Sequence, residues 1–273
     1  MLHSVPSPHS DNPPEAHWPE WIAELAGTAL LMVGGLGAVT LDFGSHSPIV
    51  ALLPSHSARL LLTGALFAAT GALVALSPLG RTSGAHLNPA VSLAFWLTGK
   101  MRHHDLGAYI CAQIVGACLG VLALRLAFPE FATVRYGMTM PGPSITPPIA
   151  ALIEAGMTSA LVLTILVFVS DMRTARWTPL AAWAVITLLV WQGAPLTGTS
   201  LNPARSVGPA LIALNGHDLW IYLVGPPAGA ILATWLVLAG MNLRPVTAKL
   251  FHDPAYRSIF KHEPGAMPTN SVA

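Results

Sequence analysis

The feature that most constrains this chain is a series of six long apolar runs, each close to the length that crosses a lipid bilayer. They cover residues 21–41, 60–77, 105–128, 149–170, 179–194 and 219–240. About 20 helical residues at 1.5 Å per residue span the roughly 30 Å hydrocarbon core. Inside lipid every backbone polar group needs a partner within its own segment, so such runs become helices. The sequence therefore predicts an all-α membrane protein with six transmembrane helices.

Composition excludes several other classes of protein. Only 9% of the 273 residues are charged and 53% are hydrophobic, whereas a soluble domain carries about 25% charged residues. The formal net charge of +1 leaves no basic face for nucleic acid. Two Cys cannot form a disulfide scaffold. The sequence contains no His-Glu zinc motif, no Gly-x-Ser-x-Gly elbow and no pair of intramembrane Asp residues, so we expect no enzyme.

The two ends of the chain are polar. Residues 1–20 hold five Pro, three His and no Lys or Arg, which predicts a disordered arm and not a secretory signal. Residues 244–273 predict a solvated tail. With both ends on one side of the membrane, nine of the 13 Lys and Arg residues fall on that side. The positive-inside rule then predicts cytoplasmic N- and C-termini, in a multi-pass protein of the plasma or inner membrane.

Between these ends, a channel domain over residues 21–243 repeats itself. The tetrapeptide Leu-Asn-Pro-Ala occurs at Asn88 and again at Asn202, and each half has a Glu early in its first span, Glu24 and Glu154. The halves, about 20–130 and 148–243, contain three spans each, so the second half lies upside down relative to the first. Inverted repeats with interrupted apolar segments place the functional site near the bilayer midplane.

A short apolar run follows each tetrapeptide, over residues 91–97 and 207–213, and neither is long enough to span. Asn is a favoured N-cap, and Pro in the first turn of a helix loses no needed hydrogen bond. The segments Asn88-Pro89-Ala90 and Asn202-Pro203-Ala204 are therefore each predicted to start a re-entrant half-helix, with the two N-termini facing each other at a central constriction. Their positive ends repel cations and protons, and the Asn amides offer N–H donors to a neutral molecule.

This pattern resembles the major intrinsic protein family, the aquaporins and aquaglyceroporins, over about residues 21–243. The resemblance implies a bundle of six spanning helices and two half-helices that forms a passive channel for water and small uncharged solutes and excludes protons and ions. It also implies a homotetramer with one pore per subunit, and no cofactor or metal. Glu24 and Glu154 are expected to accept hydrogen bonds from the re-entrant loops, with proton coupling as the alternative. His86, two residues before Asn88, is expected to organise the first loop.

The family narrows its pore at four further positions, which form its selectivity filter. The family's spacing places them at Ala68, Val190, Thr199 and Arg205. Strict water channels usually carry Phe and His at the first two positions, so the resemblance implies a wider, partly apolar opening here. Arg205 would supply five donors and a permanent positive charge. A slip of one residue in the second span would place Phe67 at the filter in place of Ala68, because neighbouring helical residues point about 100° apart.

The expected solutes follow from this opening. Ser206 follows Arg205 where glycerol channels typically carry Asp, so the filter is closer to the nodulin-26-like branch of the family. Small polyols, urea or metalloid hydroxides are expected to fit. The alternative is an ion-coupled secondary transporter, since inverted repeats and broken helices occur there too.

Two smaller patterns complete the expectations. Gly116 and Gly120, and likewise Gly225 and Gly229, form Gly-x-x-x-Gly pairs that permit close helix approach. His103 and His104 stand beside basic residues, and we expect them in a solvated loop.

Overall fold

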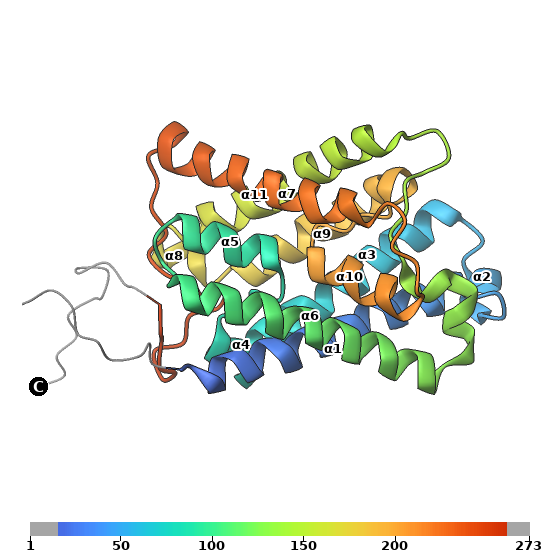
Figure 1. Cartoon of the computed structure of the whole chain (residues 1–273), viewed down its shortest axis with the longest axis horizontal. Helices are drawn as coiled ribbons and strands as arrows, with labels where there is room; N and C mark the ends of the chain where they lie inside the picture. The colour runs from blue at the N-terminus through green and yellow to red at the C-terminus, as the bar shows by residue number, and fades with distance from the viewer. Residues whose placement is uncertain (1–15, 261–273) are drawn as a thin grey trace, which may run out of the picture.

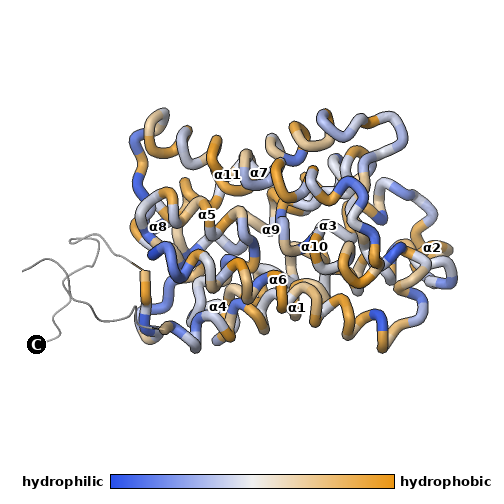
Figure 2. The backbone as a smooth tube through the Cα atoms, in the orientation of Figure 1, coloured by the Kyte–Doolittle hydropathy of each residue, from blue (hydrophilic) through white to orange (hydrophobic). Residues whose placement is uncertain are grey.

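The computed structural model describes residues 16–260, and within that part its regular structure is entirely helical. The helices form an elongated bundle (Figure 1). The start of the first helix and residues 241–260 lie at one end of this bundle, which we call the tail end. The opposite end, where the chain leaves the first helix, is called the far end. Hydrophobic residues follow the long helices, and hydrophilic ones gather mainly at the two ends (Figure 2).

Within residues 16–260, six helices are long and apolar enough to cross a membrane, as the sequence predicts. They are α1 (Trp18–Phe43), α3 (His56–Leu76), α6 (His103–Ala127), α7 (Pro147–Phe168), α9 (Thr178–Thr197) and α11 (Leu219–Trp235), the last extended by the π-helical turn η2 (Leu236–Gly240). The largest difference from the predicted bounds is the start of α3, at His56 and not at residue 60. Ser55 caps α3 there by accepting from the amide of Ala58 at 3.3 Å.

In the same described part of the chain, six short helices join the long ones. They are α2 (Pro48–Leu52), α4 (Pro78–Ser83), α5 (Pro89–Leu97), the 3-10 helix η1 (Pro129–Gly137), α8 (Met172–Ala175) and α10 (Pro203–Ile212). The half-helices α5 and α10 start near the centre of the bundle. From there α5 runs toward the tail end and α10 toward the far end (Figure 1). This confirms the two half-helices of opposite direction.

Glycine lets the same pair of helices approach closely in each half. A Cβ atom on Gly116 of α6 would collide with the carbonyl oxygen of Leu25 on α1. In the second half, a Cβ atom on Gly229 of α11 would collide with the carbonyl oxygen of Ala155 on α7. The first and third long helices of each half are therefore paired alike, while α3 and α9 pack against each other. The pairing agrees with the predicted repeat.

The N-terminal end differs from the expected arm. Helix α1 begins at Trp18, because Pro19 is well placed in a first helical turn, where no N–H is needed. His17 is buried and its Nδ1 atom lies 2.8 Å from Oδ1 of Asp105, 88 residues away in the sequence. The remainder of the predicted arm, residues 1–15, lies outside the described residues.

The C-terminal end also differs, because residues 245–260, the tail segment, pack against the bundle: residues 247–250 and Phe260 are buried, while Pro254, Ala255 and Arg257 remain exposed. The amide of Leu250 donates to the carbonyl of Gly84 at 3.0 Å. Lys249 is buried and its Nζ donates to the carbonyl of Arg81 at 2.5 Å. Arg81 forms an ion pair with Asp253 at 2.9 Å. These contacts are made by backbone carbonyls and charged side chains. No apolar periodicity in the sequence predicts them. Residues 261–273 lie outside the described part.

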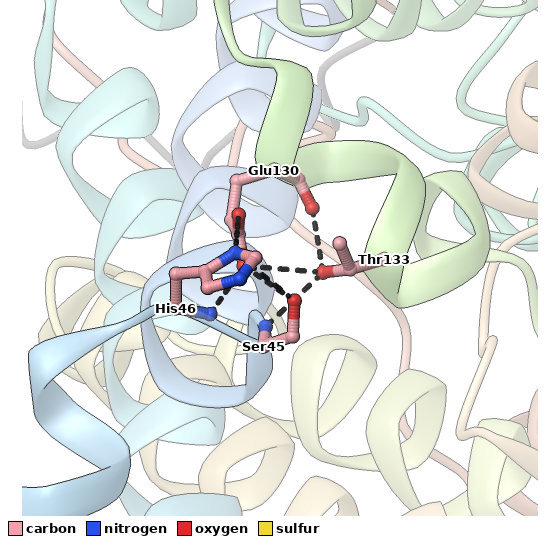
Figure 3. Close-up of polar contacts among 4 residues, drawn as sticks. All are labelled: Ser45, His46, Glu130 and Thr133. Carbon is pink, nitrogen blue, oxygen red and sulfur yellow. Dashed lines mark hydrogen bonds and ion pairs between the residues drawn. The ribbon is translucent and has the colours of Figure 1, made fainter.

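At the far end, four side chains join the loop after α1 to η1 (Figure 3). We call Ser45, His46, Glu130 and Thr133 the far-end clasp. Glu130 accepts from the His46 amide at 2.7 Å and from the Ser45 hydroxyl at 3.1 Å, and its second oxygen lies 3.0 Å from His46 Nδ1. These hydrogen bonds hold the pKa of Glu130 down at about 2, the bond from the His46 amide being the largest cause.

Candidate functional site

A cavity of about 400 Å³ runs between α3 and α9 through the bundle. Its wall includes α3 residues from His56 to Ala75 and α9 residues from Pro179 to Pro195. At 1.5 Å per residue these stretches measure about 28 Å and 24 Å, close to the roughly 30 Å of the hydrocarbon core. The cavity therefore extends over most of the thickness that a membrane channel has to cross.

At the middle of this cavity the two Asn side chains bind each other's loops. The amide nitrogen of Asn88 donates to the carbonyl of Leu201, and that of Asn202 donates to the carbonyl of Leu87, both at 2.8 Å. Each side-chain oxygen caps its half-helix, accepting from the amide of Ala90 at 2.8 Å or of Ala204 at 3.0 Å. Pro89 and Pro203 occupy the first turns, as the sequence predicts. Since a carboxamide carries two N–H groups, each Asn retains one beyond the bond to the opposite loop.

The two buried Glu residues accept hydrogen bonds from these loops. Glu24 accepts from the amides of His86 at 3.0 Å and Leu87 at 2.7 Å. Glu154 accepts from the amides of Ser200 and Leu201, each at 2.9 Å. The two sets match position for position, because each Glu binds the residues one and two before the Asn of its own half.

Five partners in this network were not predicted from the sequence, and one of them, Gln113, donates to Glu24 at 2.7 Å without a counterpart at Glu154 among the described residues. Ser83 donates to Glu24 at 2.7 Å and Thr197 donates to Glu154 at 2.6 Å. The carbonyls of these two residues accept from Tyr109 at 2.7 Å and Tyr222 at 2.8 Å. Ser83 and Thr197 each lie five residues before their Asn, so their shared offset was a signal available in the sequence.

The loops are also strained in the same way in both halves. Within these two loops, four residues other than glycine have positive φ angles between 46° and 58°: Ala85, Leu87, Thr199 and Leu201. Such a conformation costs about 1–3 kcal/mol per residue and persists only where surrounding structure holds it. The carbonyls of Leu87 and Leu201 accept the Asn bonds, so the strain accompanies the pairing of the two loops.

His86 organises the first loop, as expected, and also binds the tail segment. Its Nδ1 lies 3.1 Å from the hydroxyl of Ser92, and its Nε2 donates to the carbonyl of Ala248 at 2.8 Å. Its ring stacks on Phe260 with centroids 5.4 Å apart. Leu250 of the same segment lines the cavity, so the tail segment forms part of the cavity wall at the tail end.

The four predicted filter residues all line the cavity: Ala68, Val190, Thr199 and Arg205. Arg205 is only 6% exposed and donates from Nη1 to the carbonyl of Gly137 at 2.6 Å. The hydroxyl of Thr199 donates to the carbonyl of Leu189 at 3.3 Å. Phe67 lines the cavity as well, so both candidates on α3 contribute to its wall.

Ser206, where the resemblance implies Asp in glycerol channels, is buried among other hydroxyls. Its Oγ lies 2.7 Å from Thr139 Oγ1 and 2.6 Å from Ser200 Oγ. The loop that carries Thr139 is further held by the amide of Gly142, which donates to the carbonyl of Leu196 at 2.8 Å. Met138 of this loop lines the cavity, so the loop helps to form the far-end opening.

Comparison with known proteins agrees with this geometry. The profile of the family described as major intrinsic protein matches residues 14–237. Aquaporin NIP1-1 of Zea mays is 36% identical over 215 residues, covering 78% of this chain and 72% of the relative. The probable aquaporin AqpM of Archaeoglobus fulgidus is 38% identical over 232 residues, covering 78% and 93%. The fold is similar to that of the aquaglyceroporin from Plasmodium falciparum, with a TM-score of 0.68, 24% identity and coverage of 83% and 98%.

Proposed function

The chain belongs to the major intrinsic protein family, and from that premise we propose that its pore conducts small polyols, urea or metalloid hydroxides together with water. The protein is a passive channel for water and small solutes, not an enzyme, and it crosses the membrane several times. Its relatives include aquaporins named NIP, the nodulin-26-like branch.

The wall of the cavity near Arg205 supports this choice of solutes. Ala68 and Val190 are small or apolar and face the same cavity as Arg205 and Thr199. A short side chain at residue 68 leaves room that an aromatic ring would fill. Arg205 supplies donors for a hydroxyl or carbonyl oxygen, while the apolar residues fit the carbon side of a polyol. We therefore assign Ala68, Val190, Thr199 and Arg205 to the selectivity filter, with Asn88 and Asn202 at the central constriction.

The exclusion of protons and ions is supported by the half-helices. Both begin near the middle of the cavity, so their positive N-terminal ends lie together there. The permanent charge of Arg205 adds to the same potential. Glu24 and Glu154 are fully buried and occupied by loop hydrogen bonds. They serve as supports for the loops in this proposal, and not as sites of proton coupling.

The test is a stopped-flow swelling panel with purified protein in liposomes, covering water, glycerol, urea and boric acid. We expect rapid water flux and flux of at least one of the three solutes, each driven by the osmotic gradient alone. Flux of water with none of the solutes would overturn the proposed solute class. Flux that depends on a proton or sodium gradient would instead support the ion-coupled transporter.

We further propose that the protein is a homotetramer with both termini in the cytoplasm of a plasma or inner membrane. The segments that join the long helices at the tail end carry basic residues, among them Arg81 in α4, Arg102 before α6 and Arg173 in α8, which supports this orientation under the positive-inside rule. Native mass spectrometry would give the number of subunits. Labelling of a Cys introduced at the exposed Ser57, by a reagent that cannot cross the membrane, would test which side the far end faces.

A further inference from the structure

Three side chains that can bind a transition metal converge at the tail end, between the starts of α1 and α6. His17 directly precedes α1, while His104 and Asp105 stand in the first turn of α6. One donor atom from each of the three lies within 4.8 Å of the others. His17 Nδ1 lies 2.8 Å from Asp105 Oδ1, and His104 Nε2 lies 3.5 Å from Asp105 Oδ2.

His104 is the member of this cluster whose bonding is incomplete. Its Nε2 atom is buried, and it makes no hydrogen bond to any described residue. Asp105 Oδ1, in contrast, is well occupied, since it also accepts from Trp21 Nε1 at 3.1 Å. A buried polar atom without a partner is unfavourable. A cation placed between His104 Nε2 and the carboxylate of Asp105 would bind both atoms.

We propose that His17, His104 and Asp105 bind one divalent transition-metal ion of the Zn²⁺ class. Two imidazoles and one carboxylate are ligands that suit Zn²⁺, Co²⁺ and Ni²⁺, whereas Mg²⁺ and Ca²⁺ prefer oxygen ligands alone. Bonds of about 2.0–2.2 Å in a tetrahedral arrangement place ligand atoms about 3.3–3.6 Å apart. The 3.5 Å between His104 and Asp105 meets this spacing, while His17 must exchange its hydrogen bond with Asp105 for a bond to the ion.

This site is not part of the internal repeat. The equivalent helices of the second half, α7 and α11, follow Thr146 and Asp218. The histidine next to Asp218 is His217, whose side chain is 84% exposed. Because, within the described part of the chain, only the first half carries the cluster, the repeated pore architecture does not require it. A bound ion would tie the start of α1 to the start of α6, and the inference does not depend on which solute the channel conducts.

The test is a Co²⁺ titration of the full-length protein, purified without a polyhistidine tag and followed by visible absorption. We expect one Co²⁺ per chain, displaced by Zn²⁺. His104→Gln should weaken binding at least about tenfold, because losing even an outer partner of a metal ligand typically costs that much. Among residues 16–260, His104 Nε2 has no hydrogen-bond partner, so this variant is expected to fold. Asp105→Asn and His17→Gln should weaken binding similarly.

His103→Gln is the matched control, since His103 is an exposed neighbour with its ring 5.9 Å from that of His104. It should bind Co²⁺ as the wild type does. A variant with both His3→Gln and His9→Gln removes the other histidines of the first twenty residues, and it should also retain binding. No binding by the wild type, equal binding by His104→Gln, or loss of binding in the His3 and His9 variant would each overturn the proposal. Size-exclusion profiles confirm that each variant is folded.

Discussion

The guanidinium carbon of Arg205 lies 5.8 Å from the centre of the Phe67 ring. An Arg over an aromatic face gains about 0.5–2 kcal/mol, depending on how far both are removed from water. The Gly137 carbonyl accepts from the same guanidinium. Arg205 is therefore held by the Phe67 ring and by a backbone carbonyl. Ala68, the residue after Phe67, leaves the cavity open. Under the proposed assignment these two neighbouring residues of α3 have different roles: Phe67 supports the Arg205 side chain, and Ala68 sets the width of the filter.

Replacing Ala68 by Phe should exclude glycerol and retain water. The ring would occupy cavity space beside Arg205 and narrow the opening toward the width of one water molecule. We expect glycerol flux in proteoliposomes to fall at least about tenfold, which corresponds to about 1.4 kcal/mol of added barrier, with a much smaller change in water flux. Leu66→Phe is the matched control, because Leu66 is 41% exposed on the outside of the same helix. Unchanged glycerol flux in Ala68→Phe would assign the constriction to Phe67.

Replacing Asn88 by Asp tests the bond between the two loops. The remaining Oδ1 can still cap α5 by accepting from Ala90, but the donor to the Leu201 carbonyl is lost. A buried carbonyl without a partner costs about 1–3 kcal/mol, so we expect a lower unfolding temperature and reduced water flux. Asn202→Asp should have an effect of similar size, because the bond from Asn202 to Leu87 is the equivalent bond in the second half. A loss of stability in only one of the two variants would contradict the equivalence of the loops.

Replacing Glu24 by Gln should destabilise the fold, and solute flux should be independent of the proton gradient both before and after the replacement. Gln keeps one acceptor oxygen and places an NH₂ group where the Leu87 amide or the Ser83 hydroxyl donates now. Each unpaired buried donor costs about 1–3 kcal/mol, so thermal unfolding followed by Trp fluorescence should shift to lower temperature. The exposed Asp171→Asn serves as the control for removing one negative charge. A variant of normal stability whose flux had lost a dependence on the proton gradient would support proton coupling instead.

The far-end clasp should open in acid. The pKa of Glu130 is lowered to about 2 from an ordinary value of 4.5. The ionised carboxylate therefore stabilises the clasp above about pH 4.5, and this stabilisation is lost as the pH falls toward 2. The His46 amide should therefore exchange its hydrogen more slowly in the wild type than in Glu130→Gln near neutral pH. This difference should shrink as the pH falls through that window. A difference that stays constant down to pH 2 would show that the carboxylate is not what protects the amide.

Removing the tail segment should widen the tail-end opening. Truncation after residue 244 deletes Leu250 from the cavity wall and the acceptor of His86. We expect a higher water flux per channel, severalfold at most because the central constriction remains. Arg81→Ala, which loses the ion pair with Asp253, should make residues 245–260 more sensitive to protease in the full-length protein. Protease resistance equal to the wild type would contradict the packing of this segment.

Much of this fold could be predicted from the sequence because its determinants are local. Apolar length alone predicts the six spans, and the cap preference of Asn with the following Pro predicts where α5 and α10 begin. The contacts of Glu24 and Glu154 could be predicted because the chain contains the same arrangement twice. Ser83 and Thr197 obey the same repeat and were missed only because small hydroxyl residues are common.

The remaining features depend on residues that are distant in the sequence and have no periodic pattern. Nothing near His17 indicates that it meets Asp105, 88 residues later. The apolar residues of the tail segment, such as Leu250 and Phe260, form no run long enough to predict a helix, yet the segment is held by the carbonyls of Gly84 and Arg81. Such contacts can be recognised only in the folded structure, where the bundle brings residues that are distant in the sequence to the same end.

The bonds from Asn88 to Leu201 and from Asn202 to Leu87 also impose an order of assembly. When the first three spans have been inserted during synthesis, the strained loop before α5 still lacks its partner, which is made more than a hundred residues later. The conducting path is therefore completed only in the last stage of biogenesis, and a chain interrupted before residue 202 has helices but no channel.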